Sequence, residues 1–597
     1  MSKSRSFRTK RSEWGPLRSQ AGALVFLILV TFVAYANAWP DSLTFDDKYF
    51  AVPERFSALG LAGVGRFFTE SLWSVGGTNV GLYRPLLLVS MAIDVFIFGD
   101  WAAGYHLSNI LLHILSTLLV YGLVRHLLIA TGGPSLQSGY FALLAAVVFA
   151  VHPVHTEVVN SIFNRSEMLV TLGVVGGLWW FLNQYDRHTK LAWVGLSLIY
   201  FLALLSKESG TTMPAIVVVM LFLTTSGSWL QRVRKCLPIF WLLIPLGIYF
   251  ALRANALEVA EETVTPKTWR EVTDLAEYGM SYDSGHMLPA VGVWFDSLKL
   301  MVWPHPLQIY RDKPELNHWI ALAMQVLLLS AGIVGLVKQR IGLFLGLAFF
   351  YIAILPSSRV IGELSASPAL AERFLYLPSV GFAIILAFGL RWVVQRYSFR
   401  MAVIPVVIVA LIFTPLTWAR NADWSSDVLL FERDYEKLEN KQLILDALVG
   451  VQIQEQNFRR AAELCDLHAK IAKRKPHLRS RCGTAYGHLG QYAKAERIFT
   501  PALESKKWGA MAHFQMAEMY VLAGRRGDAR QHFEASIAGQ KSEFLKEFQR
   551  AVMLLRLYPD SRARLLEAKA HLEQAIRLQP QFFDARKLLA QVNEALD

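Results

Sequence analysis

The chain has 597 residues, of which 54% are hydrophobic, and it carries 17 Trp and a formal net charge of +13 at pH 7. This hydrophobic content excludes an ordinary soluble enzyme and indicates a protein that crosses a membrane many times. The positive charge is spread over loops and tail rather than over one basic domain. It therefore favours contact with anionic membrane lipid and argues against a nucleic-acid partner.

Apolar runs follow one another over residues 21–418, after a basic segment at 1–20. A membrane-spanning helix needs about 20 apolar residues. We expect the basic segment to stay in the cytoplasm, because Lys and Arg gather on that side. An odd number of spans, about eleven, then places everything after residue 418 outside the cytoplasm. The candidate spans are 21–39, 105–124, 139–152, 168–183, 191–206, 213–228, 238–254, 317–337, 341–356, 375–391 and 401–418.

Basic turns between the spans support this orientation. They fall on the cytoplasmic side if the apolar stretch 84–98 lies in the membrane interface or re-enters instead of crossing. The loops 40–104 and 255–316 then lie outside the cytoplasm, together with shorter loops that carry ionisable residues. The basic turns contain Arg125/His126, Arg187/His188/Lys190, Arg232/Arg234/Lys235, Lys338/Arg340 and Arg391/Arg396/Arg400.

A soluble tail, residues 425–597, follows the last span and contains a repeat. Small and apolar residues recur in one register at a step of 34 residues, which resembles the tetratricopeptide repeat. In such repeats pairs of helices stack into a solenoid whose concave face commonly binds peptide. A plain helical bundle is the alternative. The recurring pairs are Gly490 and Gly524, Ala495 and Ala529, and Phe499 and Phe533.

The sequence has three cysteines. Cys236 lies at a predicted cytoplasmic edge, where a reduced thiol is expected. Cys465 and Cys482 fall in successive helices of the repeat region, in an oxidising compartment if the orientation holds. A disulfide between them and two separate buried thiols are both consistent with the sequence.

The first external loop contains two adjacent carboxylates, Asp46 and Asp47, only a few residues after the first span. Two neighbouring carboxylates repel each other, so one of them can have a raised pKa, and a carboxylate near a hydroxyl can act as a general base. The alternative is a turn or a helix cap.

A second polar cluster, with His152, His155, Glu157 and Arg165, lies between two spans. Placing an ionisable residue at a membrane boundary costs free energy unless the residue is solvated, forms an ion pair or has a functional role. The histidines and Glu157 are candidate metal ligands, but Pro153 breaks helical spacing and no second set of donors follows. We therefore expect a hydrogen-bonded frame for an anionic ligand, and a bound divalent metal is the less favoured alternative.

Adjacent acids and bases mark two further boundaries, Lys207-Glu208 and Glu372-Arg373, the second followed by Tyr376. Ion pairs that only order the helices are the alternative interpretation. Four cations nevertheless share one predicted membrane face, an arrangement suited to a lipid-linked phosphate. These cations are Arg84, Arg165, Lys207 and Arg373.

Several motifs together resemble one family over essentially the whole chain, the transmembrane and tetratricopeptide-repeat-containing O-mannosyltransferases of the GT-C superfamily. The motifs are FDD after the first span, YRPL at Tyr83 to Leu86, GYHLSNILLH with His106, VFAVHPVHTEVV followed by NRSEML, LLSKESG, WPHPLQIYRD at Trp303 to Asp312, and AERFLYLPSVGF.

The resemblance implies an all-α fold, a GT-C membrane domain of about eleven helices with a C-terminal repeat solenoid. It implies an inverting glycosyltransferase that moves a hexose, expected to be mannose, from a polyprenyl-phosphate donor to Ser/Thr hydroxyls of proteins. Asp46 or Asp47 is the implied base, and no cofactor is required. The expected site residues that bind the donor phosphate or substrate are Arg84, His106, His152, His155, Glu157, Arg165, Lys207, Glu208, Arg373 and Tyr376.

The short repeat array, and a glycosylation sequon at Asn164 inside the expected active face, favour a bacterial homologue. The expected location is thus the bacterial inner membrane with the site and the tail in the periplasm, or the endoplasmic-reticulum membrane in a eukaryote. Two alternatives stay open. The acceptor can be a lipid or an envelope glycan, or the protein can be a transporter or an assembly scaffold whose repeats bind partners.

Overall fold

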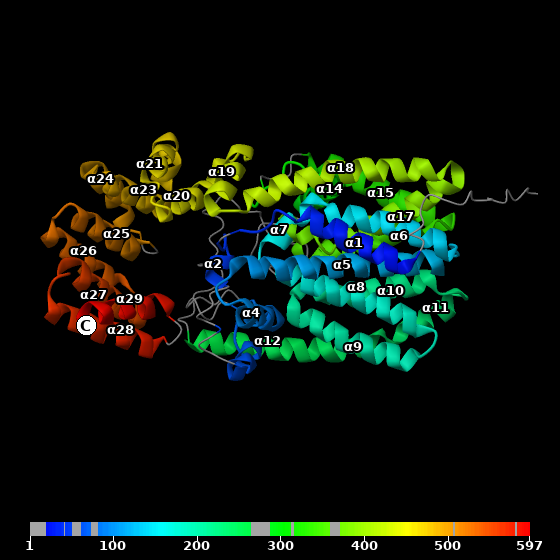
Figure 1. Cartoon of the computed structure of the whole chain (residues 1–597), viewed down its shortest axis with the longest axis horizontal. Helices are drawn as coiled ribbons and strands as arrows, with labels where there is room; N and C mark the ends of the chain where they lie inside the picture. Colours follow the sequence, from blue (N-terminus) through cyan, green and yellow to red (C-terminus); the bar gives the residue numbers. More distant parts are fainter. Residues whose placement is uncertain are drawn as a thin grey trace, which may run out of the picture.

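The computed structural model describes residues 19–40, 42–50, 56, 61–72, 82–263, 287–311, 316–358, 371–505, 508–579 and 582–597. Over these ranges the regular structure is helical and includes no β-strand, so the predicted all-helical class is confirmed. A bundle of long helices lies beside a group of shorter tail helices (Figure 1). Most of the basic segment 1–20 and the middle of the loop 255–316 lie outside the described residues.

Each predicted span contains a helix or part of one. Leu237–Leu242 (η6) directly precedes α12 and belongs to the same predicted span. The bundle helices in predicted spans are α1 (Gln20–Ala34), α5 (Ala102–Ala130), α6 (Ser135–Val151), α8 (Arg165–Tyr185), α9 (Thr189–Ser206), α10 (Met213–Thr224), α12 (Leu243–Thr263), α15 (His318–Val337), α16 (Ile341–Ile354), α17 (Ser379–Arg396) and α18 (Phe399–Asp423). One further helix, α14 (Met287–Val302), packs on α15 and lies inside the predicted loop 255–316, where no helix was expected.

Fewer helices than predicted are long and apolar enough to cross a membrane by themselves. Six described helices meet that standard, or seven if α6 and the bent segment Pro153–Asn160 form one span. Several helices are short: α1 has 15 residues, and α10 and α16 each join a 3₁₀ turn, η5 (Glu208–Thr212) and η7 (Leu355–Ser357). The helix α8 is long enough, with 21 residues, but is not among the six. The six helices support an integral membrane protein, and the count of eleven stays a prediction.

The stretch predicted to lie in the interface forms α4 (Pro85–Phe98), a helix of 14 residues. This is shorter than the roughly 20 residues that a span needs. One side of α4 packs on η2 (Leu61–Phe68) and on α5, whereas Phe96 on the other side is 82% exposed. An apolar helix that leaves one side uncovered suits the membrane interface.

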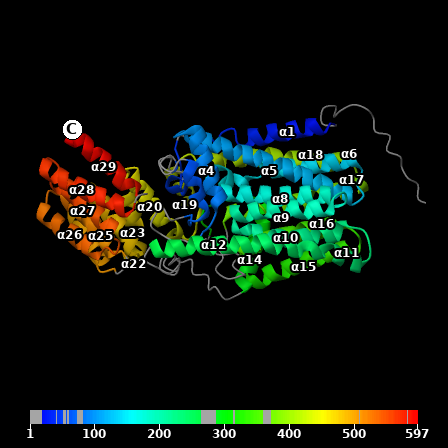
Figure 2. The ribbon, with the colours of Figure 1, turned by 90° about the horizontal axis from the view of Figure 1, so that it is seen from below.

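The two ends of the bundle carry different loops. At one end the predicted cytoplasmic turns meet, because His126 bonds to Asn183, Tyr185 bonds to the carbonyl of Lys235, and Arg391 bonds to Thr131. In both ribbon views α11 (Trp229–Cys236) lies at this end, and the tail helices lie beyond the other (Figures 1 and 2). That other end carries α2 (Asp47–Phe50), η4 (Pro153–His155), α7 (Thr156–Asn160), η5 and η8 (Glu372–Leu375).

The tail helices pack against their neighbours in the order of the chain. Gly490 and Gly524 each end a helix with positive φ, at 72° and 71°, a conformation that favours glycine. Ala495, Ala529 and the equivalent phenylalanines are fully buried. The helices are α19 (Asp427–Lys437), α20 (Leu445–Gln454), α21 (Phe458–Leu467), α22 (Ala469–Arg474), α23 (Pro476–His488), α24 (Tyr492–Leu503), α25 (Gly509–Leu522), α26 (Arg526–Gly539), α27 (Glu543–Leu557), α28 (Arg562–Leu578) and α29 (Phe583–Leu596).

A disulfide joins Cys465 of α21 to Cys482 of α23. The sequence is consistent with either this bond or two separate thiols, and in the structure the bond is present. Cys236 is a free buried cysteine.

We expect Cys465→Ser to lower the free energy of unfolding of the tail by about 3 kcal/mol, because the bond closes a loop with a sequence separation of 17 and restricts the unfolded chain. Thermal unfolding of the purified protein, with Cys236→Ser as the matched control, measures the difference. Equal melting of the two variants, or freely alkylated Cys465 and Cys482 in the unreduced protein, would contradict the bond.

Candidate active site

The two adjacent carboxylates of the first loop have different surroundings. Asp47 is fully buried and accepts N–H bonds from Ile162 and Phe163, both at 2.8 Å, and a hydroxyl bond from Ser161 at 3.1 Å. Asp46 is partly exposed, and no hydrogen bond to its carboxylate is found among the described residues. Asp47 therefore holds the loop onto residues 161–163, and the carboxylate of Asp46 is left available for a ligand.

Electrostatics also distinguish the two carboxylates. Burial raises the pKa of Asp46 to about 6, and the nearby charges of Glu157 and Asp427 raise it too, whereas Arg373 lowers it. Burial raises the pKa of Asp47 to about 7 against the opposing effect of its backbone hydrogen bonds. A carboxylate with a pKa near 6 is largely ionised at neutral pH and still accepts a proton readily, which is what a general base requires.

Arg373 is held beside Asp46 by Glu157. The backbone N–H of Arg373 donates to Glu157 Oε2 at 2.8 Å, and its guanidinium pairs with Oε1 of the same carboxylate. Burial lowers the pKa of Arg373, but the charges of Glu157, Asp46 and Glu167 outweigh this effect and raise it. The guanidinium thus stays charged, and its side chain is 14% exposed.

Two cations lie against one aromatic ring at this end of the bundle. The guanidinium carbon of Arg373 is 5.0 Å from the centroid of the Phe374 ring, and Lys207 Nζ is 5.3 Å from the same centroid. Lys207 also pairs with Glu167. The next residue after Lys207, Glu208, binds Arg84 through two guanidinium nitrogens, with the shortest distance 2.9 Å. The structure therefore brings Arg84, Lys207 and Arg373 close to one another, and Arg373 also acts on the carboxylate of Asp46.

Arg165 is placed differently from these three cations. It is 1% exposed, and its guanidinium bonds to Asn109 at 2.6 Å, to the carbonyl of Tyr105 at 3.1 Å and to Asp94 of α4. All of its nitrogens donate to protein groups. This arrangement fastens α4 and α5 to the start of α8 and leaves no part of the guanidinium facing a ligand.

The predicted histidines lie deeper, in a buried aromatic cluster. His152 donates Nε2–H to the carbonyl of Met301 at 3.1 Å, and its Nδ1 accepts the N–H of Val154, which fixes the neutral tautomer. His155 lies 3.0 Å from the Ser379 hydroxyl, and the two rings of His155 and Tyr376 have centroids 4.7 Å apart. These contacts order the buried residues next to Glu157 and Arg373.

Tyr376 and His106 complete the set of predicted residues. The hydroxyl of Tyr376 lies 2.7 Å from His113 Nδ1. His106 is buried on α5 near Arg165, and within the described ranges neither of its ring nitrogens has a hydrogen-bond partner. In the described part of the chain no group of three or more His, Cys, Asp or Glu side chains is placed to hold a metal ion.

Sequence reasoning missed three carboxylate or cation partners. Asp94 pairs with Arg165, Arg311 pairs with Glu372 at 2.8 Å, and Asp427 of the tail reaches the Asp46 loop. Asp94 had a signal, because it is the one ionisable residue inside the apolar run 85–98. Arg311 lies in the WPHPLQIYRD motif, but the sequence identifies neither its partner nor that of Asp427, since both partners are more than 60 residues away.

The chain is similar to several proteins that are named protein O-mannosyl-transferases. Human protein O-mannosyl-transferase TMTC4 is 26% identical over 500 residues, covering 74% of this chain and 62% of that protein. The Caenorhabditis elegans protein O-mannosyl-transferase F38B6.6 is 25% identical over 68% of this chain and 56% of its own length. Human protein O-mannosyl-transferase TMTC3 is 22% identical over 86% of this chain and 56% of its own.

The chain thus spans about three fifths of the length of these curated relatives. No family model and no solved structure matches it. Over most of its length the chain is similar to protein O-mannosyl-transferases of the TMTC family.

Proposed function

We propose that this protein transfers mannose from a polyprenyl-phosphate donor to Ser/Thr hydroxyls of protein acceptors at the non-cytoplasmic face of a membrane. The observation that carries the proposal is the placement of Asp46 beside Arg373, which contacts the same Phe374 ring as Lys207, at one end of an apolar bundle. A hydroxyl to be activated and a phosphate to be released need this combination of a base and two cations. The names of the homologues supply the sugar.

The chemistry is a single displacement. The hydroxyl oxygen of the acceptor attacks the anomeric carbon while Asp46 takes its proton, and the bond from that carbon to the phosphate oxygen breaks with its electron pair. Attack opposite the leaving group inverts the anomeric centre. Arg373 and Lys207 meet the charge that develops on the departing polyprenyl phosphate, so the reaction as written uses no cofactor.

The other predicted residues support this centre. Arg84 is held by Glu208 beside Lys207 and adds a third positive charge for the donor phosphate. Glu157 orients the guanidinium of Arg373, and His152 and His155 order the buried residues next to it. In this proposal Arg165, which is occupied by Asp94, positions α4 and does not contact the phosphate.

We place the site and the tail outside the cytoplasm, in the periplasm of a bacterium or the endoplasmic-reticulum lumen of a eukaryote. What supports this side is that the basic turns meet at the opposite end of the bundle, where His126 bonds to Asn183 and Arg391 to Thr131. The disulfide Cys465–Cys482 fits an oxidising compartment.

The tail is proposed to be a tetratricopeptide-type solenoid that binds the acceptor or a partner. Gly490 and Gly524 adopt the same conformation one repeat apart, as that assignment requires. A pocket of about 530 Å³ between α26, α27 and α28 is lined by Glu534, Lys546, Arg550 and His571 among others. The lining combines charged side chains of both signs with the apolar Ile537, Met553 and Leu554, which suits a peptide segment that has both polar and apolar side chains.

Comparing the glycoproteins of a deletion strain with those of its parent tests the proposal. We expect hexose-modified Ser/Thr peptides to disappear in the deletion strain and to return with the wild-type gene, as read by mass spectrometry. If hexose is instead lost from a lipid or an envelope glycan, that molecule and not a protein is the acceptor. Unchanged glycoproteins, lipids and glycans would favour the transporter or scaffold alternative.

A further inference from the structure

The soluble tail contacts the loop that carries the carboxylate pair. Asp427, the first residue of α19, is 5% exposed. Its Oδ1 accepts the backbone N–H of Phe45 at 2.6 Å, and its Oδ2 pairs with Lys48 Nζ at 2.7 Å. Asp427 thereby joins the residues on either side of Asp46 and Asp47.

Phe45 has a backbone conformation that needs such support. Its φ is 54°, in the left-handed region that side chains other than glycine, asparagine and aspartate seldom adopt. Strain of this kind persists at functional sites only where surrounding contacts hold it. Besides the bond to Asp427, the ring of Phe45 meets the ring of Phe431 edge to face, with centroids 5.7 Å apart. These two contacts come from α19 and add to the turn bond from the N–H of Asp47 to the carbonyl of Thr44 at 3.1 Å.

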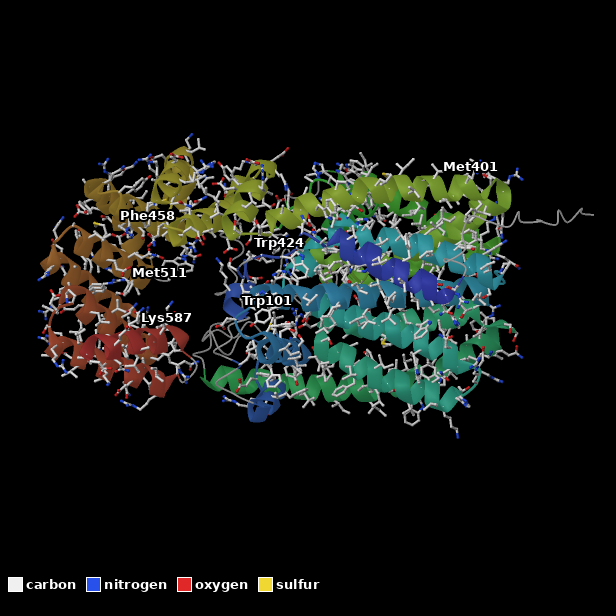
Figure 3. The ribbon with its side chains drawn as sticks, in the orientation of Figure 1. Trp101, Met401, Trp424, Phe458, Met511 and Lys587 are labelled. Atoms are coloured by element: carbon white, nitrogen blue, oxygen red, sulfur yellow. A yellow bond between two sulfur atoms is a disulfide. The ribbon has the colours of Figure 1, made fainter. Side chains whose placement is uncertain are left out.

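The helix α19 is itself fixed to the bundle. Asp434 is fully buried, bonds to Arg420 of α18 at 2.8 Å and accepts the N–H of Ile309 at 2.5 Å. Trp424, labelled in Figure 3, is buried at the junction of α18 and α19 and packs in one cluster with Ile309. The loop that contains Ile309 also carries Gln308 and Arg311, which both bond to Glu372 beside Arg373. One tail helix thus braces the loops on both sides of the candidate site.

We propose that Asp427 and Phe431 are positioning residues that hold the Asp46 loop in its reactive geometry, so that the first helix of the tail completes the catalytic site. This inference depends on the proposed role of Asp46 as the base. It makes the tail part of the membrane-boundary machinery and not only a module that recruits acceptors. A displacement of about 1 Å at a reacting group is enough to cost on the order of 100-fold in rate.

The pH dependence of the rate provides a second readout. The negative charge of Asp427 raises the pKa of Asp46, so its removal should shift the acid limb of the pH–rate profile to lower pH. The ionisable groups that face Asp46 are Asp47 and Lys48 from its own loop, Glu157 from α7, Arg373 from η8 and Asp427 from α19.

The test uses the full-length protein with polyprenyl-phosphate mannose as donor and a protein extract from cells that lack the gene as acceptor. We expect Asp427→Asn and Phe431→Leu each to lower kcat by roughly 10- to 100-fold with little change in the KM for donor. Only Asp427→Asn should also move the acid limb to lower pH. Glu436→Gln, which changes an exposed acid of the same helix, is the matched control and should behave like the wild type.

Wild-type kcat in both variants would overturn the inference, as would a loss of donor affinity without a loss of kcat. If Asp427→Asn fails to fold, Phe431→Leu decides, because it retains every ion pair and an apolar side chain. The proposed function is tested separately by Asp46→Asn. An inactive Asp46→Asn together with a fully active Phe431→Leu and Asp427→Asn would refute the positioning role alone.

Discussion

Replacing Asp46 by asparagine is expected to lower the rate of mannose transfer by at least about 10²-fold while the protein stays folded. The amide cannot take the proton of the acceptor hydroxyl, and the described structure gives the Asp46 carboxylate no hydrogen bonds that the change would break. Asp47→Asn should behave differently. It removes an acceptor for the N–H of Ile162 or Phe163, so it should lower thermal stability as well as rate.

The pH dependence follows from the same residue. Because the pKa of Asp46 is raised to about 6, the base is ionised above that pH and protonated below it. Transfer by the wild type should therefore fall as pH drops through about 6. Initial rates measured across pH for folded wild type and Asp46→Asn check both points. Near-normal turnover by Asp46→Asn and by Asp47→Asn would remove the pair from the mechanism.

Replacing Arg373 by lysine is expected to weaken transfer almost as much as replacing it by alanine, on the order of 10²-fold. A lysine can keep the ion pair with Glu157, but it cannot also present a second, planar set of N–H groups to a phosphate. The KM for polyprenyl-phosphate mannose and kcat, measured for both variants, give the comparison.

Arg460→Lys is the matched control for that experiment. Arg460 makes a two-point pair with Glu432 in the tail, with distances of 2.8 and 2.9 Å. The same chemical change at this pair should leave donor affinity and rate unaltered. If Arg373→Lys keeps both as well, Arg373 is a structural partner of Glu157 and the donor phosphate binds elsewhere.

The helices of the fold were largely predictable because they rest on local signals. Apolar runs mark the bundle, and glycines 34 residues apart mark the turns at Gly490 and Gly524. The length of each helix was less predictable. The 3₁₀ turns at Glu208–Thr212 and Leu355–Ser357 shorten α10 and α16 at their ends, and no composition signal distinguishes such a turn from the helix it joins.

Which residues gather at the site was predictable, but which of them pair was not. Lys207-Glu208 and Glu372-Arg373 are acids and bases adjacent in sequence, yet none of the four pairs with its neighbour. Each side chain points to a different element, because consecutive residues at a helix end project in different directions. The pairs in the structure are Lys207 with Glu167, Glu208 with Arg84, Glu372 with Arg311, and Arg373 with Glu157.

The contact between the tail and the site had no sequence signal at all. Phe45 and Asp427 are 382 residues apart, and an aspartate at the start of a helix is an ordinary residue in that position. The left-handed backbone of Phe45 is also invisible in the sequence, since phenylalanine seldom adopts it. Only the packed arrangement of α18, α19 and the first loop reveals this contact.

The most direct test of the account is a transfer reaction with the purified full-length protein in lipid nanodiscs. The reactants are polyprenyl-phosphate mannose labelled in the sugar and a protein extract from cells that lack the gene. We expect label to enter Ser/Thr residues of protein, one polyprenyl phosphate to be released for each mannose transferred, and Asp46→Asn to abolish both. Folded wild-type protein that leaves the extract unlabelled, or labelling that Asp46→Asn does not change, would contradict it.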